Sequence, residues 1–125
     1  MNLLLDTHVL LWAVDQPERL DRAAREAIRN GNNRVQVSAA SAWEISIKAA
    51  LGKLRFDSDL GAVLDASGFD PLAIGFDHAR VAGALPPVHR DPFDRMLVAQ
   101  AQLEVLTLVT RDPVFSRYDV ATLAA

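Results

Sequence analysis

The chain opens with an uninterrupted apolar run at residues 3–5, which meets an aspartate at position 6. An apolar run without polar alternation is typical of a strand buried on both faces, as at the centre of a parallel sheet. A helical pattern follows over residues 9–14, so Asp6 stands where a buried strand ends and a helix begins. In open α/β sheets, ligands and catalytic groups collect at that carboxyl edge.

The rest of the chain alternates between strand-like and helix-like segments joined by short loops. Such alternation predicts βαβ units and a parallel sheet. We find no internal repeat, low-complexity segment or linker, so we predict one α/β domain over residues 1–125. The further strands are expected at 34–38, 72–74, 105–110 and 120–123, and the further helices at about 21–30, 39–51, 58–66, 77–85 and 91–103.

Composition narrows the class of protein. Half of the 125 residues are apolar, which is ample for a packed core, and there is no cysteine for disulfides or thiolate chemistry. With 13 basic and 16 acidic residues the net charge is −3, which argues against a simple basic coat for nucleic acid. No segment approaches the roughly 20 apolar residues of a membrane span, and the first residues lack the basic region of a signal peptide. We therefore expect a cytoplasmic protein without a membrane contact.

Four carboxylates are predicted at one edge of the sheet. Asp6 ends the first strand, and Glu44 lies in the first turns of the helix after the second strand. Asp94 lies in the first turn of a helix that Asp91 caps, and Asp112 follows the strand at 105–110. In a parallel sheet the strand ends and the following helix starts share one edge, so these four side chains can converge.

Converging carboxylates repel one another unless a cation neutralises them. Oxygen ligands without cysteine suit Mg²⁺ or Mn²⁺ better than zinc. A site of that kind can activate a water and stabilise charge on a phosphodiester. The four acids therefore predict a divalent-metal site.

Each acid also has a purely structural interpretation. Asp6 and Asp112 precede helical segments and could be N-caps. Asp94 could complement the helix dipole, and Glu44 completes a capping-box pattern over residues 41–44. The functional interpretation depends on the convergence of the four acids and not on any one of them.

The basic residues and histidines form weaker patterns. Lys48 stands four residues after Glu44 and is a candidate ion-pair partner. The three histidines are too scattered in sequence for a metal triad, although His89 beside Arg90 could touch phosphate. Six basic residues near the acids could face a phosphate backbone, although each alone is more simply an ordinary solvated side chain: Lys48, Lys53, Arg55, Arg90, Arg95 and Arg111.

An ordered set of motifs runs from one end of the chain to the other. It comprises Leu4-Leu5-Asp6-Thr7-His8 with Leu11-Trp12, Ser38-Ala39-Ala40-Ser41-Ala42-Trp43-Glu44-Ile45 with Lys48 and Leu51-Gly52-Lys53-Leu54, His89-Arg90-Asp91-Pro92-Phe93-Asp94-Arg95 through Ala99-Gln100-Ala101, and Thr110-Arg111-Asp112. In this order the chain resembles PIN-domain ribonucleases, and specifically VapC-type toxins of toxin–antitoxin pairs.

The resemblance implies a three-layer α/β/α domain with a central, mainly parallel sheet. It implies that Asp6, Glu44, Asp94 and Asp112 bind Mg²⁺ or Mn²⁺ and cleave RNA, with Asp91 as a supporting acid. It also implies a homodimer that a cognate antitoxin neutralises, with the antitoxin tail in the acidic groove.

The predicted function is a metal-dependent endoribonuclease that serves as a toxin. Two alternatives stay open. A phosphohydrolase of the haloacid-dehalogenase type also places an aspartate after its first strand, but it requires a second aspartate two positions on, where this chain has His8. The other alternative is a non-catalytic PIN-like module that binds RNA or a protein.

Overall fold

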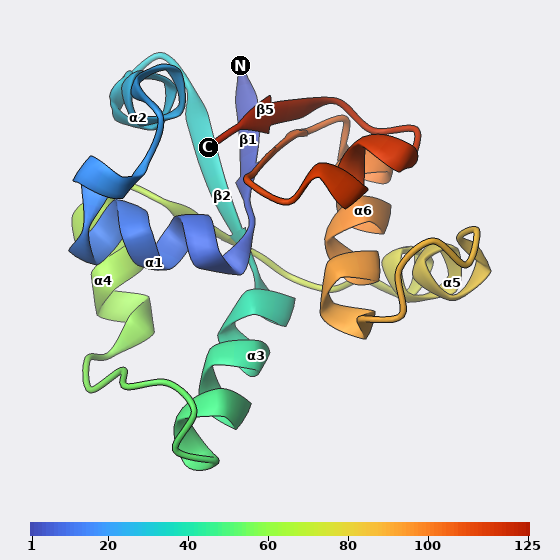
Figure 1. Ribbon diagram of the computed structural model, residues 1–125, viewed down its shortest axis with the longest axis horizontal. Coiled ribbons are helices and arrows are strands. Elements are labelled where there is room, and N and C mark those ends of the chain that lie inside the picture. The colour runs from blue at the N-terminus through green and yellow to red at the C-terminus, as the bar shows by residue number, and fades with distance from the viewer.

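A single parallel sheet of five strands organises the structure, a computed structural model that describes residues 1–125 (Figure 1). The strand order is β3-β2-β1-β4-β5, and every neighbouring pair is parallel. The strands are β1 (Asn2–Leu5), β2 (Arg34–Ser38), β3 (Asp70–Leu72), β4 (Thr107–Thr110) and β5 (Thr122–Ala124).

Helices connect these strands and cover both faces of the sheet. They are α1 (Thr7–Asp15), α2 (Arg22–Arg29), α3 (Ala39–Ala50), α4 (Leu60–Ser67), α5 (Phe76–Ala84) and α6 (Pro92–Glu104), with short 3₁₀ segments at Pro17–Arg19 and Pro113–Arg117. None of the helices has the length and apolar character needed to cross a membrane.

The central strand β1 explains the three layers. Its side chains alternate, so Leu3 and Leu5 enter one apolar cluster and Leu4 enters the other. The first cluster includes side chains of α1, α2 and α4, and the second includes side chains of α6 (Figure 1). All three leucines are fully buried. The predicted strand with two buried faces and the predicted α/β/α architecture are confirmed.

The outer strands differ from prediction at their ends. Strand β3 covers 70–72 and not 72–74, because it pairs with β2 through Asp70, Pro71 and Leu72. Proline is tolerated there because β3 is an edge strand with one neighbour. Strand β5 likewise covers 122–124 and not 120–123.

Strand β4 begins two residues later than predicted. Val105 is the C-cap of α6, in the left-handed conformation with φ of 55°, and is 83% exposed. Its backbone N–H donates to the Ala101 carbonyl, which satisfies one free end of the helix. The apolar run at 105–110 therefore divides between a helix cap and a strand.

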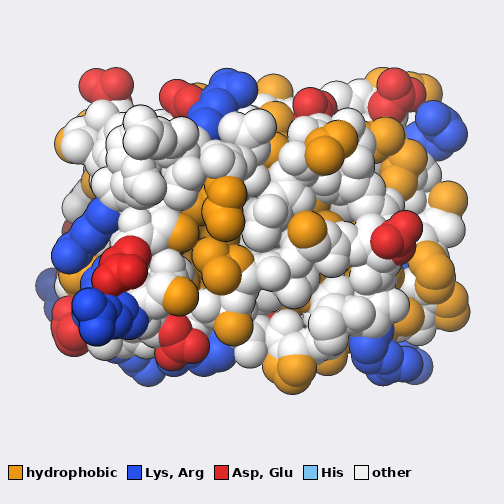
Figure 2. All heavy atoms as spheres, turned by 90° about the horizontal axis from the view of Figure 1, so that it is seen from above, with side chains coloured by type: hydrophobic (Ala, Val, Ile, Leu, Met, Phe, Trp, Pro, Cys, Tyr) orange, Lys and Arg blue, Asp and Glu red, His pale blue; other side chains and the backbone are white.

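The carboxyl ends of the strands lie at one edge, and the two ends of the sheet differ in character. The view from above in Figure 2 faces the end where β1 begins, and there acidic and basic side chains are interspersed around apolar surface. The predicted acids lie at the other end, where β1 meets α1 and β2 meets α3 (Figure 1).

Candidate active site at the carboxyl edge of the sheet

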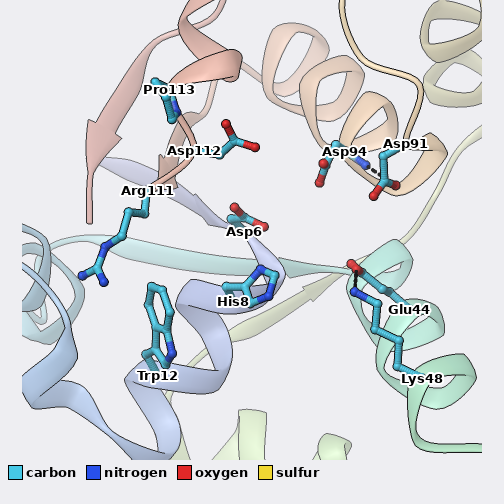
Figure 3. Close-up of a pocket in the computed structure, with 10 residues that line it drawn as sticks. All are labelled: Asp6, His8, Trp12, Glu44, Lys48, Asp91, Asp94, Arg111, Asp112 and Pro113. Carbon is cyan, nitrogen blue, oxygen red and sulfur yellow. Dashed lines mark hydrogen bonds and ion pairs between the residues drawn. The ribbon is translucent and has the colours of Figure 1, made fainter. Parts of the chain in front are cut away.

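A cleft of about 490 Å³ opens at this edge. All four predicted acids line it, and Figure 3 shows them approaching from β1, α3, α6 and the segment after β4. The complete lining is Asp6, His8, Trp12, Glu44, Lys48, Asp91, Asp94, Arg111, Asp112 and Pro113. The convergence expected from a parallel sheet is therefore present.

Asp6 lies at the floor of the cleft, between β1 and α1. It occupies the N-cap position of α1, but its side chain makes no capping hydrogen bond. Instead its Oδ2 accepts a 2.8 Å hydrogen bond from the Thr110 hydroxyl at the end of β4. Burial raises the pKa of Asp6, and this outweighs the lowering by the hydrogen bond from Thr110 and by the nearby His8. The capping interpretation of this side chain is wrong, which leaves the carboxylate available to the cleft.

Glu44 projects inward from α3 and is only 5% exposed. The predicted capping box is wrong, because β2 passes directly into α3 and Ser38 is the N-cap, accepting from the Ala40 N–H at 2.9 Å. Glu44 Oε1 accepts from the Thr7 hydroxyl at 2.8 Å. Its Oε2 pairs with the Lys48 ammonium at 2.6 Å, so the predicted ion pair is confirmed. Both oxygens of Glu44 thus have partners.

The Lys48 ammonium takes part in the same electrostatic field. Its pKa is raised, first by the hydrogen bond to Glu44 and then by the charges of Glu44, Asp91 and Asp94, against the opposing effect of burial. Lys48 therefore stays charged at the rim of the acidic cleft.

Asp94 carries the most perturbed carboxyl of the cleft. Its neighbour Asp91 is the N-cap of α6, since Asp91 Oδ1 accepts from the backbone N–H groups of Phe93 at 2.9 Å and Asp94 at 3.4 Å. The predicted cap is confirmed, and the Asp94 side chain is left free for another role. Its pKa is raised to about 8, first by burial and then by neighbouring carboxylates, of which Asp91 has the largest effect.

The two oxygens of Asp112 have different roles, one as a cap and one facing the cleft. Its Oδ1 accepts from the Val114 N–H at 3.0 Å and caps the 3₁₀ segment that starts at Pro113, so the predicted cap is confirmed. Its Oδ2 lies 3.7 Å from the His89 Nε2. A carboxylate can cap with one oxygen and still present the other to a ligand.

His89 joins the acids, which sequence reasoning missed. Its Nε2 lies 3.5 Å from Asp94 Oδ2, and the ligand atoms of His89, Asp94 and Asp112 all lie within 4.8 Å of one another. His78 has other partners: it accepts from the Gly75 N–H and contacts Glu104. The one sequence signal was that His89 precedes Asp94 by five residues on a loop that leads into α6.

Two of the candidate phosphate-facing basic residues have structural roles. Arg95 does not line the cleft, because its guanidinium donates to backbone carbonyls of the loop between α5 and α6. Its main acceptors are the carbonyls of Ala82, Leu85, Pro86 and His89. Arg111 lines the cleft, but it donates to the Ala125 carbonyl and stacks over Trp12 at 4.4 Å.

The donor set fits a divalent cation. Five carboxylates line the cleft, whereas only Lys48 and Arg111 bring positive charge from lysine or arginine. Burial is the largest cause of the raised pKa of Asp6 and of Asp94, and neighbouring carboxylates add to both, so the charged form of each is disfavoured. Carboxylate oxygens are the preferred ligands of Mg²⁺ and Mn²⁺. A bound cation would stabilise the charged forms of both Asp6 and Asp94.

Comparison with known proteins identifies the family. A family model for the PIN domain matches residues 3–121. The chain belongs to the PIN-domain family. A curated relative, Ribonuclease VapC22 of Mycobacterium tuberculosis, is 31% identical over 122 residues, which cover 89% of this chain and 87% of the relative. This PIN domain is therefore not a haloacid-dehalogenase-type phosphohydrolase.

Solved structures agree on the fold. VapBC2 from Rickettsia felis, bound to a DNA fragment from its promoter, matches with a TM-score of 0.73 and 18% identity over 99% of this PIN domain and 98% of that chain. A toxin–antitoxin complex from Klebsiella pneumoniae matches with a TM-score of 0.66 and 20% identity over 97% and 95%. At these identities the likeness concerns the fold.

Proposed function

We propose that residues 1–125 form one PIN domain that acts as a metal-dependent endoribonuclease, the toxin of a toxin–antitoxin pair. The observation that carries this proposal is the convergence of the four predicted acids, Asp6, Glu44, Asp94 and Asp112, on one cleft. The 31% identity to a protein named as a VapC ribonuclease supports RNA as the substrate.

The four acids would have two roles, metal binding and activation of the attacking water. Asp6, Asp94 and Asp112 would hold Mg²⁺ or Mn²⁺, and Glu44 would help to bind the metal or would orient and deprotonate the attacking water. The hydrogen bond from Thr7 and the ion pair with Lys48 support a positioning role for Glu44, because they fix both of its oxygens. When bound, the cation supplies Lewis acidity toward water and the phosphate.

The proposed reaction is hydrolysis of a phosphodiester. Water attacks phosphorus in line with the 3′ oxygen and Glu44 accepts a proton from that water. The bond from phosphorus to the 3′ oxygen breaks, and the departing 3′ oxygen takes a proton from solvent. The products carry a 5′-phosphate and a 3′-hydroxyl, because water and not the 2′-hydroxyl is the nucleophile.

The partners follow from the same proposal. The substrate is RNA, the place of action is the cytoplasm, and the active form is a homodimer. Two structural neighbours are a VapBC protein and a toxin–antitoxin complex, which supports a cognate antitoxin for this chain as well. An adjacent small open reading frame that encodes a DNA-binding antitoxin would support the biological role.

A cleavage assay on a mixed RNA pool tests the activity. We expect the wild type to cleave with Mn²⁺ or Mg²⁺, to stop with EDTA, and to leave 5′-phosphate and 3′-hydroxyl ends. Asp94→Asn should not cleave, although circular dichroism should show an intact fold. Ends with 2′,3′-cyclic phosphate would contradict the mechanism. RNA binding without cleavage by the wild type would favour the non-catalytic alternative.

A further inference from the structure

We propose that His89 supplies a nitrogen ligand to the cation and makes this site prefer Mn²⁺, or a similar transition-metal ion, over Mg²⁺. This inference rests on the proposed cation site and adds to it a residue outside the acidic set. It assigns to His89 the role of a selectivity-determining ligand on the α6 side of the cleft.

The first support is an imidazole nitrogen without a partner. His89 Nε2 is buried from solvent and has no hydrogen-bond partner, although the whole side chain is 16% exposed. It lies 3.5 Å from Asp94 Oδ2 and 3.7 Å from Asp112 Oδ2. The two contacts are within ion-pair distance, but neither is a hydrogen bond, and a buried polar atom without a hydrogen bond is unfavourable. A cation between the nitrogen and the two carboxylates would satisfy all three groups.

The second support is the set of contacts that hold His89 in place. Its backbone N–H donates to the Tyr118 hydroxyl at 2.8 Å, and its carbonyl accepts from Arg95 at 3.2 Å. Its ring lies nearly parallel to the Tyr118 ring, with the planes 11° apart, and contacts Phe115 at 5.3 Å between centroids. These contacts restrain the backbone and the ring of His89, and so the direction of Nε2, before any ligand binds.

The third support is the spacing of the donor atoms. Two adjacent ligands of an octahedral ion at about 2.2 Å lie about 3.1 Å apart. The observed separations of 3.5 Å and 3.7 Å exceed this by only a few tenths of an ångström. All three ligand atoms lie within 4.8 Å of one another, so side-chain rotations of Asp94 and Asp112 can bring them onto one ion.

The donor chemistry sets the preference among metals. Imidazole suits transition-metal ions, whereas Mg²⁺ favours an all-oxygen set with several waters. On the α3 side of the cleft, both oxygens of Glu44 already have partners. A nitrogen on the α6 side therefore discriminates Mn²⁺ from Mg²⁺.

Electron spin-echo envelope modulation of the Mn²⁺ complex is the direct test. The wild type should show a nitrogen directly coordinated to Mn²⁺, and its coupling should change when histidine is labelled with ¹⁵N. The coupling should vanish in His89→Asn, which replaces the nitrogen with an amide oxygen, and persist in His8→Asn. His8 is a matched control because it also lines the cleft.

Calorimetric titration of the full chain with Mn²⁺ and Mg²⁺ supplies the second readout. We expect His89→Asn to weaken Mn²⁺ binding by about 10-fold or more and to change Mg²⁺ binding by less than about 2-fold. Mn²⁺ bound to the wild type without a coordinated nitrogen would overturn the role of His89 and leave the acidic site in place. Absence of any Mn²⁺ binding would overturn the proposed function as well.

Discussion

The two sides of the cleft differ in whether the protein supplies partners for their buried carboxylates. On the α3 side, Glu44 has Thr7 on one oxygen and Lys48 on the other, so its charge is compensated within the protein. On the α6 side, Asp94 has no ion-pair partner among the lysines and arginines, and its pKa rises to about 8. The α6 side is therefore the one that requires a cation for its charge balance.

Compensation on one side also limits what that side can do. Glu44 can bind a cation only if its oxygens are shared with existing partners, whereas Asp94 and Asp112 each keep an oxygen that faces His89. We therefore regard Glu44 on the α3 side as the acid that positions and deprotonates the attacking water, and the α6 side as the main ligand set, with Asp6 between them on the floor. Substitutions on the two sides should behave differently.

The largest expected effect concerns RNA cleavage. Asp6→Asn and Asp94→Asn should each reduce the cleavage rate by about 10³-fold or more, because each removes a ligand charge at nearly constant shape. Glu44→Gln should have a smaller effect, about 100-fold, as for the loss of a general base. Single-turnover cleavage at saturating Mn²⁺ measures both. Equal losses on both sides would remove the distinction between ligand and positioning acids.

The second effect concerns stability against pH. The pKa of Asp94 is higher in the folded protein than in the unfolded chain, so its ionisation opposes folding. This penalty is absent below about pH 4 and grows as the pH rises toward about 8. Without metal, Asp94→Asn should therefore be more stable than the wild type by up to about 5 kcal/mol above pH 8 and equally stable near pH 3.5.

Urea denaturation in EDTA at several pH values measures this difference. Asp119→Asn is the matched control, because Asp119 is an exposed acid outside the cleft. Addition of Mn²⁺ should stabilise the wild type and should have much less effect on Asp94→Asn. A wild type more stable than Asp94→Asn at pH 8 in EDTA would show that the protein compensates this charge without a cation.

The third effect tests how Glu44 is held. Thr7→Val removes the hydroxyl that donates to Glu44 Oε1 and keeps a similar shape at a buried position. We expect a loss of about 1–2 kcal/mol in the free energy of unfolding and about a 10-fold slower cleavage. Thr7→Ser retains the donor and should recover most of both. If Val and Ser behave alike, the hydroxyl does not position Glu44.

The smallest effect separates the cap at Asp91 from its charge. Asp91→Ser keeps a capping oxygen, so stability should change by less than about 0.5 kcal/mol, whereas Asp91→Ala should cost about 1 kcal/mol. Loss of the Asp91 charge should lower the pKa of Asp94, because Asp91 is its most influential charged neighbour. Carbon-13 NMR titration of the Asp94 carboxyl checks this, and an unchanged pKa would contradict it.

Much of the fold could be predicted from periodicity. The apolar run of β1 marked a strand with two buried faces, and the alternation of strands and helices predicted a parallel sheet. The cap at Asp91 was predictable because capping is local and Pro92 follows directly. The outer strands were less predictable, since the bounds of β3 and β5 depend on pairing with β2 and β4.

The location of the acids could be predicted from the sequence, because parallel strands bring their carboxyl ends to one edge. The hydrogen-bond partners of each acid could not be predicted. Asp6 is held by Thr110, which lies 104 residues away, and Glu44 is held by Thr7, which lies 37 residues away. Such pairs depend on how the layers pack and have no local signature.

The sequence by itself therefore determined the sheet, its order of helices and strands, and the edge at which four acids meet. The tertiary structure decided which acids have a positively charged partner. It also placed Arg95 against the backbone carbonyls of the loop before α6, and it brought His89 next to Asp94 and Asp112. The physical reason is the distance along the chain over which each effect acts. Backbone periodicity and capping act over a few residues, whereas burial and charge depend on neighbours that only folding brings together.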